Sequence, residues 1–189
     1  MDICKVKSEW LVLLKSPKVF LLPIERHDII TLSEWIKNNL DFSLISPTSL
    51  FSFNLDELEN WYNSLVHNPR VRVFVIRTTE NKIPIGLVEI NNIDWRNRNA
   101  EIGIFIAYEN WRKKGYGSNT LNLLLNYSFN HLNLYKLYAK ISEDNHPSIK
   151  LFEKFNFQKE ATLRKFIFKN NKYIDLFIYS LLKDEYNNE

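Results

Sequence analysis

Three consecutive cations at residues 112–114 run directly into a Gly-x-Gly segment at Gly115 and Gly117. The preceding residues 100–106 form a β-branched and aromatic run typical of a buried strand, and residues 116–132 repeat their apolar side chains at helical spacing. This order of strand, basic loop and helix start leaves unpaired backbone N–H groups beside a partial positive charge. Glycine lets the backbone approach an anion closely, so the loop can hold a pyrophosphate. A solvated basic loop before an ordinary helix is the competing interpretation.

Length and composition indicate one globular domain. The chain has 189 residues, enough for a single domain with a sizeable core. Its 45% apolar and 25% charged residues are typical of soluble globular proteins. The longest apolar runs are far shorter than a membrane span or a signal-peptide core, which predicts a cytoplasmic protein with no membrane partner.

The cysteine and histidine content argues against a metal site. The single Cys4 excludes an internal disulfide and a cysteine-based metal site. His27, His67, His131 and His146 show no paired spacing of the kind that binds metals. The sequence therefore predicts no metal.

Charge is distributed unevenly along the chain. Residues 25–60 hold seven acidic and two basic residues, a net charge of −5, and residues 111–172 hold twelve basic and four acidic residues, a net charge of +8. This indicates an anionic ligand on the second half and a cationic one near the first, although solvated helix faces account for most of these charges individually. The overall charge of +3 is too small to argue for nucleic acid.

Hydrophobic periodicity and turn residues define the elements that must position the loop. Strands are predicted at residues 19–24, 71–77, 84–93, 100–106 and 137–141, with a final hairpin of residues 157–168 and 173–182. Helices are predicted at residues 27–40, from Asn54 or Asp56 to before Pro69, at 116–132, and after a cap at Asn145 or His146. We expect one α/β (α+β) domain with a mixed, mostly antiparallel sheet of about seven strands, about four helices and the order β-α-α-β-β-β-α-β-α-β-β. Residues 1–17 are expected to be an N-terminal extension, 18–183 the domain and 184–189 a tail.

Four segments carry a resemblance to a known family. They are Trp111–Gly117, Leu132–Tyr138, Asn145–Phe157 with its Asn-x-x-Ser, and Lys172–Leu176. In this order and spacing they resemble the GNAT superfamily of acyl-CoA N-acyltransferases. The likeness is greatest to the branch of ribosomal-protein N-terminal acetyltransferases and bacterial spermidine N-acetyltransferases, and it covers about residues 18–183. It favours a phosphate-binding loop over a solvated one.

The resemblance implies a site for acetyl-CoA. Backbone amides of the loop would hold the pyrophosphate, at Arg112, Lys113, Lys114, Gly115, Tyr116, Gly117 and Ser118. The end of the preceding strand, Ile104, Phe105 and Ile106, would pair with pantetheine in a slot formed where this strand parts from the strand at 137–141. Asn145 and Ser148 would lie near the CoA arm and the thioester sulfur.

Two residues depart from the pattern of the family. Lys113 stands where the loop often has glycine. Phe152, also expected beside the cofactor, stands where many members have a tyrosine that protonates the leaving thiolate. Phenylalanine cannot donate a proton, so the resemblance implies Ser148 as the donor. A first-turn helix serine without a catalytic role is the alternative, and water can also protonate a thiolate, because a thiol has an ordinary pKa of about 8.5.

The implied reaction is direct attack of a neutral primary amine on the thioester of acetyl-CoA, with a backbone N–H near Ile106 polarising the carbonyl. Glu89 and Glu101, both in predicted strands, are candidate bases, acting directly or through water. Either one can equally be an ordinary strand residue. The acceptor stays open between a protein N-terminus, a polyamine and another small amine, and the protein is expected to be a monomer or homodimer.

Two other functions compete with catalysis. A catalytically silent CoA-binding sensor or scaffold of the same fold is the main alternative, because Phe152 lacks the proton donor. A basic nucleic-acid-binding domain ranks last because no reader motif is present, so no nucleic-acid partner is expected.

Overall fold

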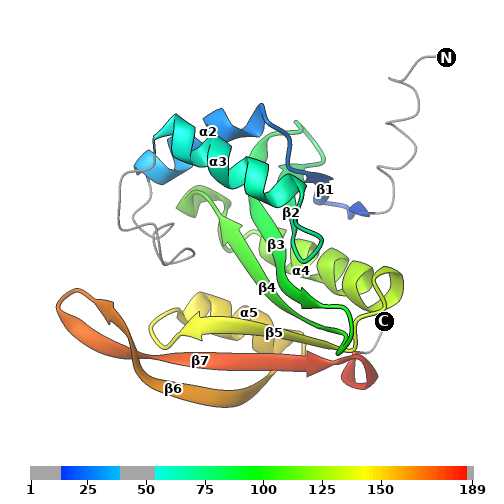
Figure 1. Cartoon of the computed structure of the whole chain (residues 1–189), viewed down its shortest axis with the longest axis vertical. Coiled ribbons are helices and arrows are strands. Elements are labelled where there is room, and N and C mark those ends of the chain that lie inside the picture. Colours follow the sequence, from blue (N-terminus) through cyan, green and yellow to red (C-terminus); the bar gives the residue numbers. More distant parts are fainter. Residues whose placement is uncertain (1–13, 39–53, 187–189) are drawn as a thin grey trace.

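The computed structural model describes residues 14–38 and 54–186 of the chain. They form one seven-stranded sheet in the order β1-β2-β3-β4-β5-β7-β6. Every neighbouring pair is antiparallel except β4 and β5, which are parallel. The strands are β1 (Val19–Pro23), β2 (Arg72–Thr78), β3 (Pro84–Asp94), β4 (Asn99–Ile106), β5 (Lys136–Ser142), β6 (Gln158–Lys169) and β7 (Lys172–Leu182). The predicted mixed, mostly antiparallel sheet is confirmed (Figure 1).

Four α-helices accompany this sheet in the described residues. They are α2 (Asp28–Asn38), α3 (Leu55–Val66), α4 (Tyr116–Asn126) and α5 (His146–Lys154). The predicted order of strands and helices is therefore confirmed. The apolar repeat after the glycine loop continues past α4 in a π-helical segment, Tyr127–His131. Residues 39 and 40, the end of the first predicted helix, lie outside the described residues. None of the described helices is long and apolar enough to cross a membrane.

Local capping chemistry fixes two of the helix starts. Asn54, rather than Asp56, caps α3, and it forms a reciprocal capping box with Glu57. Asn145, rather than His146, caps α5, and its side chain accepts a hydrogen bond from the backbone N–H of Ser148 at 3.2 Å. The Asn-x-x-Ser segment therefore has a structural task at the start of α5.

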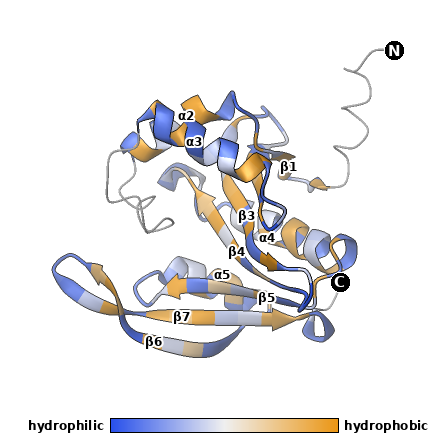
Figure 2. Ribbon diagram, in the orientation of Figure 1, coloured by the Kyte–Doolittle hydropathy of each residue, from blue (hydrophilic) through white to orange (hydrophobic). Residues whose placement is uncertain are grey.

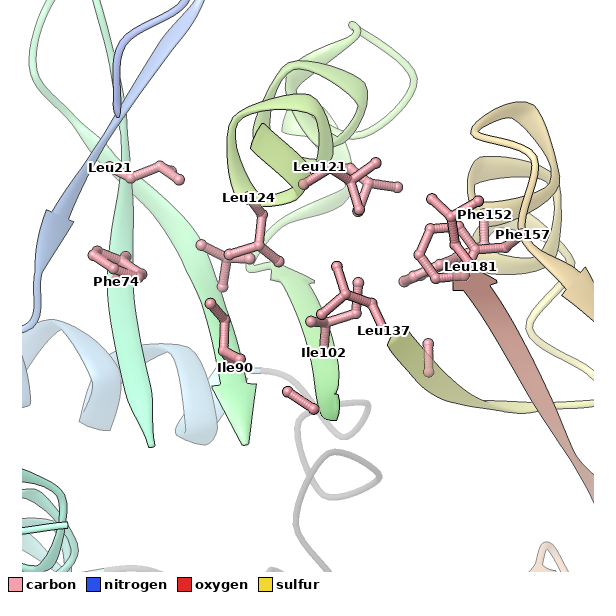
Figure 3. Close-up of a cluster of buried hydrophobic side chains, with 14 of the residues drawn as sticks. Leu21, Phe74, Ile90, Ile102, Leu121, Leu124, Leu137, Phe152, Phe157 and Leu181 are labelled. Carbon is pink, nitrogen blue, oxygen red and sulfur yellow. The ribbon is translucent and has the colours of Figure 1, made fainter. Parts of the chain in front are cut away.

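Helices cover both faces of the sheet, and each face has its own hydrophobic core. On one face, α4 and α5 pack on the central strands, and Figure 3 shows Leu121 and Leu124 pointing toward Ile90 and Ile102. Leu121, Leu124, Leu125, Ser128 and Phe129 are all buried, which confirms the predicted apolar stripe. On the other face, α2 and α3 cover a smaller core: Leu32, Trp35, Val73, Val75, Leu87, Phe105 and Ala107. Hydrophobic residues are frequent along β3 and β4, which lie between these layers (Figure 2).

A buried ion pair attaches α2 to the sheet. Asp28 is 3% exposed at the start of α2 and pairs with the guanidinium of Arg77 from β2. Its other carboxylate oxygen accepts a hydrogen bond from the backbone N–H of Glu25 at 3.0 Å. One of the carboxylates in the acidic first third therefore holds the fold together and is not free to bind a ligand.

The parallel strands β4 and β5 part after a short pairing. They are in register only for Asn99 with Lys136, Ala100 with Leu137 and Glu101 with Tyr138. Beyond these residues β4 stays paired with β3 and β5 with β7, so the two halves of the sheet separate. Figure 1 shows the two strands close together at their starts and far apart at their ends. We call this separation the β4–β5 divergence.

Candidate active site

The edge of β4 that faces the divergence presents backbone hydrogen-bonding groups. The N–H of Ala107 donates to Ile85 of β3 at 2.9 Å, and the carbonyl of Phe105 lies against Gly86. Because successive strand residues direct their backbone groups to opposite edges, the groups of Ile104 and Ile106 face the divergence. An extended ligand can pair there as an added strand. The side chain of Phe105 does not face this edge, since it is 6% exposed and packs on Trp35 at 6.2 Å between ring centres.

The glycine loop has a backbone shaped for an anion. Gly115 is the N-cap of α4 and has a left-handed conformation with φ +86°. It offers no capping side chain, and the first turn of α4 contains no acidic residue. The N–H groups at the start of this helix are thus left for a ligand with negative charge. Lys113 is also left-handed, with φ 59°, a conformation that glycine adopts more easily than lysine, which fits the glycine that the resemblance implied at this position.

The side chains of the loop hold it against the sheet. The guanidinium of Arg112 donates to the carbonyl oxygen of Ile106 at 3.2 Å, which joins the loop to the end of β4. The ammonium of Lys114 lies 5.8 Å from the ring centre of Trp111, and that ring meets Tyr116 edge-on at 5.6 Å. The loop therefore places cations and helix amides directly beyond the β4 edge, and this arrangement fits the pyrophosphate of CoA.

Helix α5 approaches the start of α4 closely. A Cβ atom added to Gly117 would lie 3.4 Å from the side chain of Leu151 of α5, so the two helices are in contact here. Ser148 lies one helical turn before Leu151 and therefore on the same side of α5. This places Ser148, half-buried in the first turn of α5, on the side that faces the start of α4.

Phe152 belongs to the main core. It is 4% exposed and meets Phe157 edge-on at 4.9 Å between ring centres, where Figure 3 shows the two rings beside Leu181. A hydrophobic ring fits this apolar position without leaving a polar atom unsatisfied. Phenylalanine, at the position where the resemblance implied a proton-donating tyrosine, therefore has a packing rationale here.

Glu89 lies beside the divergence on the face covered by α2 and α3. It is opposite Gly103 in the β3–β4 register, and a Cβ atom on Gly103 would lie 2.9 Å from its Oε1. The absence of a side chain at Gly103 thus leaves room for the carboxyl. Burial raises the pKa of Glu89, a hydrogen bond from Asn91 opposes this shift, and the negative charge of Glu101 adds to it. Among the described residues no cation forms a salt bridge with Glu89. A carboxylate with a raised pKa and no bound cation is a stronger base.

Glu101, the other candidate base, is already occupied. Its Oε2 accepts a hydrogen bond from the ammonium of Lys140 on β5 at 2.9 Å and another from Asn92 at 3.1 Å. This ion pair joins β4 to β5 at the end of their pairing, because Glu101 belongs to the last residue pair of the two strands. Because Lys140 already occupies this carboxylate, the geometry favours Glu89 over Glu101 as the base.

Three residues that the sequence did not single out contribute to this region. Gly103 makes room for Glu89, and Lys140 neutralises Glu101. Lys18, just before β1, donates a hydrogen bond to the backbone carbonyl of Lys114 at 2.7 Å. Only the alternation along the strands offered a signal for the first two, and no local pattern links Lys18 to a loop 96 residues away. No group of three or more His, Cys, Asp or Glu in the described ranges is placed to hold a metal.

Comparison with known proteins agrees with this geometry. The family model described as "Acetyltransferase (GNAT) domain" matches residues 18–158. The spermidine N(1)-acetyltransferase of Vibrio cholerae is 36% identical over 135 residues, covering 71% of this chain and 77% of that protein. The Escherichia coli K12 enzyme of the same name is 30% identical over 171 residues, covering 89% and 88%.

Solved structures are similar as well. The structure of the Vibrio cholerae spermidine N-acetyltransferase in complex with CoA and spermine superposes with a TM-score of 0.81 at 30% identity. The match covers 90% of this chain and 99% of that one. The chain therefore belongs to the GNAT family and is an acetyltransferase of that type.

Proposed function

We propose that the protein transfers the acetyl group of acetyl-CoA to a primary amine, with Glu89 as the base that removes the amine proton. The observation that carries this proposal is the half-buried carboxyl of Glu89, without a cation partner in the described residues, next to the β4–β5 divergence. Acetyl-CoA, when bound, supplies the acetyl group as a reactive thioester. The loop amides and the edges of Ile104 and Ile106 would hold it, and the N–H of Ile106 is placed to polarise the carbonyl.

Two groups of this chain would move protons, one on each face of the sheet. Glu89 accepts a proton from the amine as the new C–N bond forms, on the side of α2 and α3. The C–S bond breaks, and Ser148 on α5 gives its hydroxyl proton to the departing sulfur, regaining one from water. This division between faces fits a reaction in which the amine and the thiol occupy opposite sides of the acetyl group.

The relatives named spermidine N-acetyltransferases support a polyamine acceptor. The paired carboxylates favour a second candidate, the α-amine of a peptide or protein. Asp28 is held by Arg77 in a buried pair, and Glu59 with Arg26 at 2.8 Å and Glu101 with Lys140 at 2.9 Å form more exposed pairs, so a polycation would have to compete with these cations. Deprotonating an α-amine of pKa about 7.8 costs about 1 kcal/mol at pH 7, against roughly 4.6 kcal/mol for an amine of pKa about 10.4. The smaller cost of deprotonating an α-amine is within reach of a single base such as Glu89.

A panel of amines tests the proposal and separates the acceptors. The protein is incubated with acetyl-CoA while free thiol is followed, with spermidine, spermine, a lysine-free peptide with a free N-terminus, and an N-terminally blocked peptide containing one lysine. We expect thiol release, with the highest kcat/KM at pH 7 for the peptide with the free N-terminus. Release with spermidine alone would identify a polyamine acceptor. Tight CoA binding without release from any amine would instead support the silent sensor or scaffold.

Removing the hydroxyl of Ser148 tests the proton donor. The Ser148→Ala variant is expected to lower kcat about tenfold or less, because a thiolate whose conjugate thiol has a pKa of about 8.5 is already a fair leaving group. The cap of α5 should survive, since Asn145 binds the backbone N–H of this residue rather than its hydroxyl. Ser64→Ala is the matched control, because that exposed serine lies on α3 with its hydroxyl on the carbonyl of Trp61. If kcat is unchanged in Ser148→Ala, another group or water protonates the sulfur.

A further inference from the structure

Lys18 reaches the glycine loop from a distant part of the chain. It lies directly before β1, and its ammonium donates a hydrogen bond to the carbonyl oxygen of Lys114 at 2.7 Å. A Cβ atom added to Gly115 would lie 3.3 Å from the same nitrogen. The ammonium therefore lies beside the N-cap of α4. An ammonium has three donors, and the carbonyl of Lys114 takes one of them.

The charges around this ammonium favour an anion next to it. Arg112, Lys113 and Lys114 belong to the same loop, and the first turn of α4 contains no acidic residue. The start of a helix carries a partial positive charge of its own, which repels a nearby lysine. No carboxylate in residues 14–38 or 54–186 forms a salt bridge with Lys18. The ammonium of Lys18 therefore lies among other positive charges. This position becomes electrostatically favourable when a negative group binds next to it.

We propose that Lys18 is a direct ligand of the pyrophosphate of CoA, in addition to the loop amides. This inference rests on the proposed function, because that function provides the CoA site. The pyrophosphate, rather than the 3′-phosphate, is its partner because Lys18 is anchored to the backbone at Lys114 and Gly115, where the helix amides begin. Through Lys18, the segment before β1 contributes directly to binding of the pyrophosphate in the glycine loop.

The experiment measures the dissociation constants of CoA and dephospho-CoA by calorimetry, for the wild type, Lys18→Gln and Lys18→Arg. Lys15→Gln is the matched control, since Lys15 is an exposed lysine of the same short segment. Losing a charge-assisted hydrogen bond to a phosphate is expected to weaken both ligands about tenfold in Lys18→Gln. The loss should shrink at high salt, and Lys18→Arg should restore most of the affinity. Lys15→Gln should bind both ligands as the wild type does.

Three outcomes overturn the inference. Unchanged affinity of Lys18→Gln for both ligands removes Lys18 from the site. A loss confined to CoA, with dephospho-CoA unaffected, assigns Lys18 to the 3′-phosphate and contradicts the pyrophosphate placement. A loss of affinity that is independent of salt, with a lower melting temperature of the ligand-free variant, assigns Lys18 a purely structural role at the loop. If the wild type itself binds neither CoA nor dephospho-CoA, the proposed function fails. This outcome is distinguished from a failure of the Lys18 inference because it is seen in the wild type, without any variant.

Discussion

Glu89→Gln is expected to lower kcat/KM for the amine by about a hundredfold, the lower end of what a positioned general base contributes. Glutamine has nearly the same shape and still fits over Gly103, but it does not accept the proton. Because the base must be unprotonated, the wild-type rate should rise with pH through the raised pKa of Glu89. In the variant this contribution should disappear, and only the rise that comes from deprotonation of the amine itself should remain. Steady-state rates with a saturating acetyl donor between pH 5 and 9 measure both effects.

Stability distinguishes a catalytic role of Glu89 from a structural one. A carboxyl whose pKa is raised by folding binds its proton more tightly in the folded state. It therefore contributes stability at pH values below its unfolded pKa, and this contribution is lost as the pH rises through the raised folded pKa. At neutral pH the buried charge is a cost, so Glu89→Gln should melt at the same temperature as the wild type or higher.

Two further variants serve as references for Glu89. Glu80→Gln, at an exposed position in the turn after β2, should leave the rate unchanged. Glu101→Gln should lose less activity than Glu89→Gln, because Lys140 already occupies that carboxylate. If Glu101→Gln abolishes activity and Glu89→Gln does not, Glu101 is the base.

Gly115→Trp is expected to raise the KM for acetyl-CoA at least tenfold. The left-handed conformation of this residue, φ +86°, costs a residue with a side chain roughly 1–2 kcal/mol. The indole would also fill the space next to the ammonium of Lys18, where even a Cβ atom lies 3.3 Å away. Binding of the phosphates should suffer more than the chemical step, so KM should change more than kcat. Initial rates over a range of acetyl-CoA concentrations measure the two constants.

Backbone strain alone has its own control at this position. Asn171 is left-handed, with φ 60°, in the exposed turn between β6 and β7, so Asn171→Trp introduces similar strain away from the loop. It should lower stability without raising the KM for acetyl-CoA. An unchanged KM in Gly115→Trp would place the cofactor somewhere other than this loop.

Sequence patterns predicted the helices and strands well, because these elements depend on apolar spacing and turn residues that lie close together in the sequence. The apolar spacing after the loop corresponds to buried residues of α4, such as Leu121 and Leu124, and the hairpin near the C-terminus forms at the Asn170 and Asn171 turn. The caps were harder to assign, since Asn54 and Asp56 both suit a helix start and only the reciprocal bond to Glu57 decides between them. The boundaries otherwise differ by a few residues, as expected when helix ends and strand ends depend on tertiary contacts.

The catalytic side of the site depended on contacts between distant residues. Glu89 and Glu101 were equivalent candidates in the sequence, because both are acidic residues within strands. Across the strands, Glu89 faces Gly103 in a half-buried position, whereas Glu101 meets Lys140. Strand register, rather than residue type, decides which groups lie against each carboxylate. The acidic first third shows the same dependence on tertiary contacts, since one of its carboxylates, Asp28, holds Arg77 of β2.

The sequence by itself determined the order of the elements, and it predicted the loop and the kind of anion that suits it, since spacing, glycine and consecutive cations act within a few residues of one another. Only the tertiary structure decided how that loop is completed. The parting of β4 from β5 after Glu101 exposes the strand edge, Arg112 ties the loop to Ile106, and Lys18 arrives from the start of β1. These contacts join segments far apart in the chain, and their energies depend on distance in space, which no local pattern records.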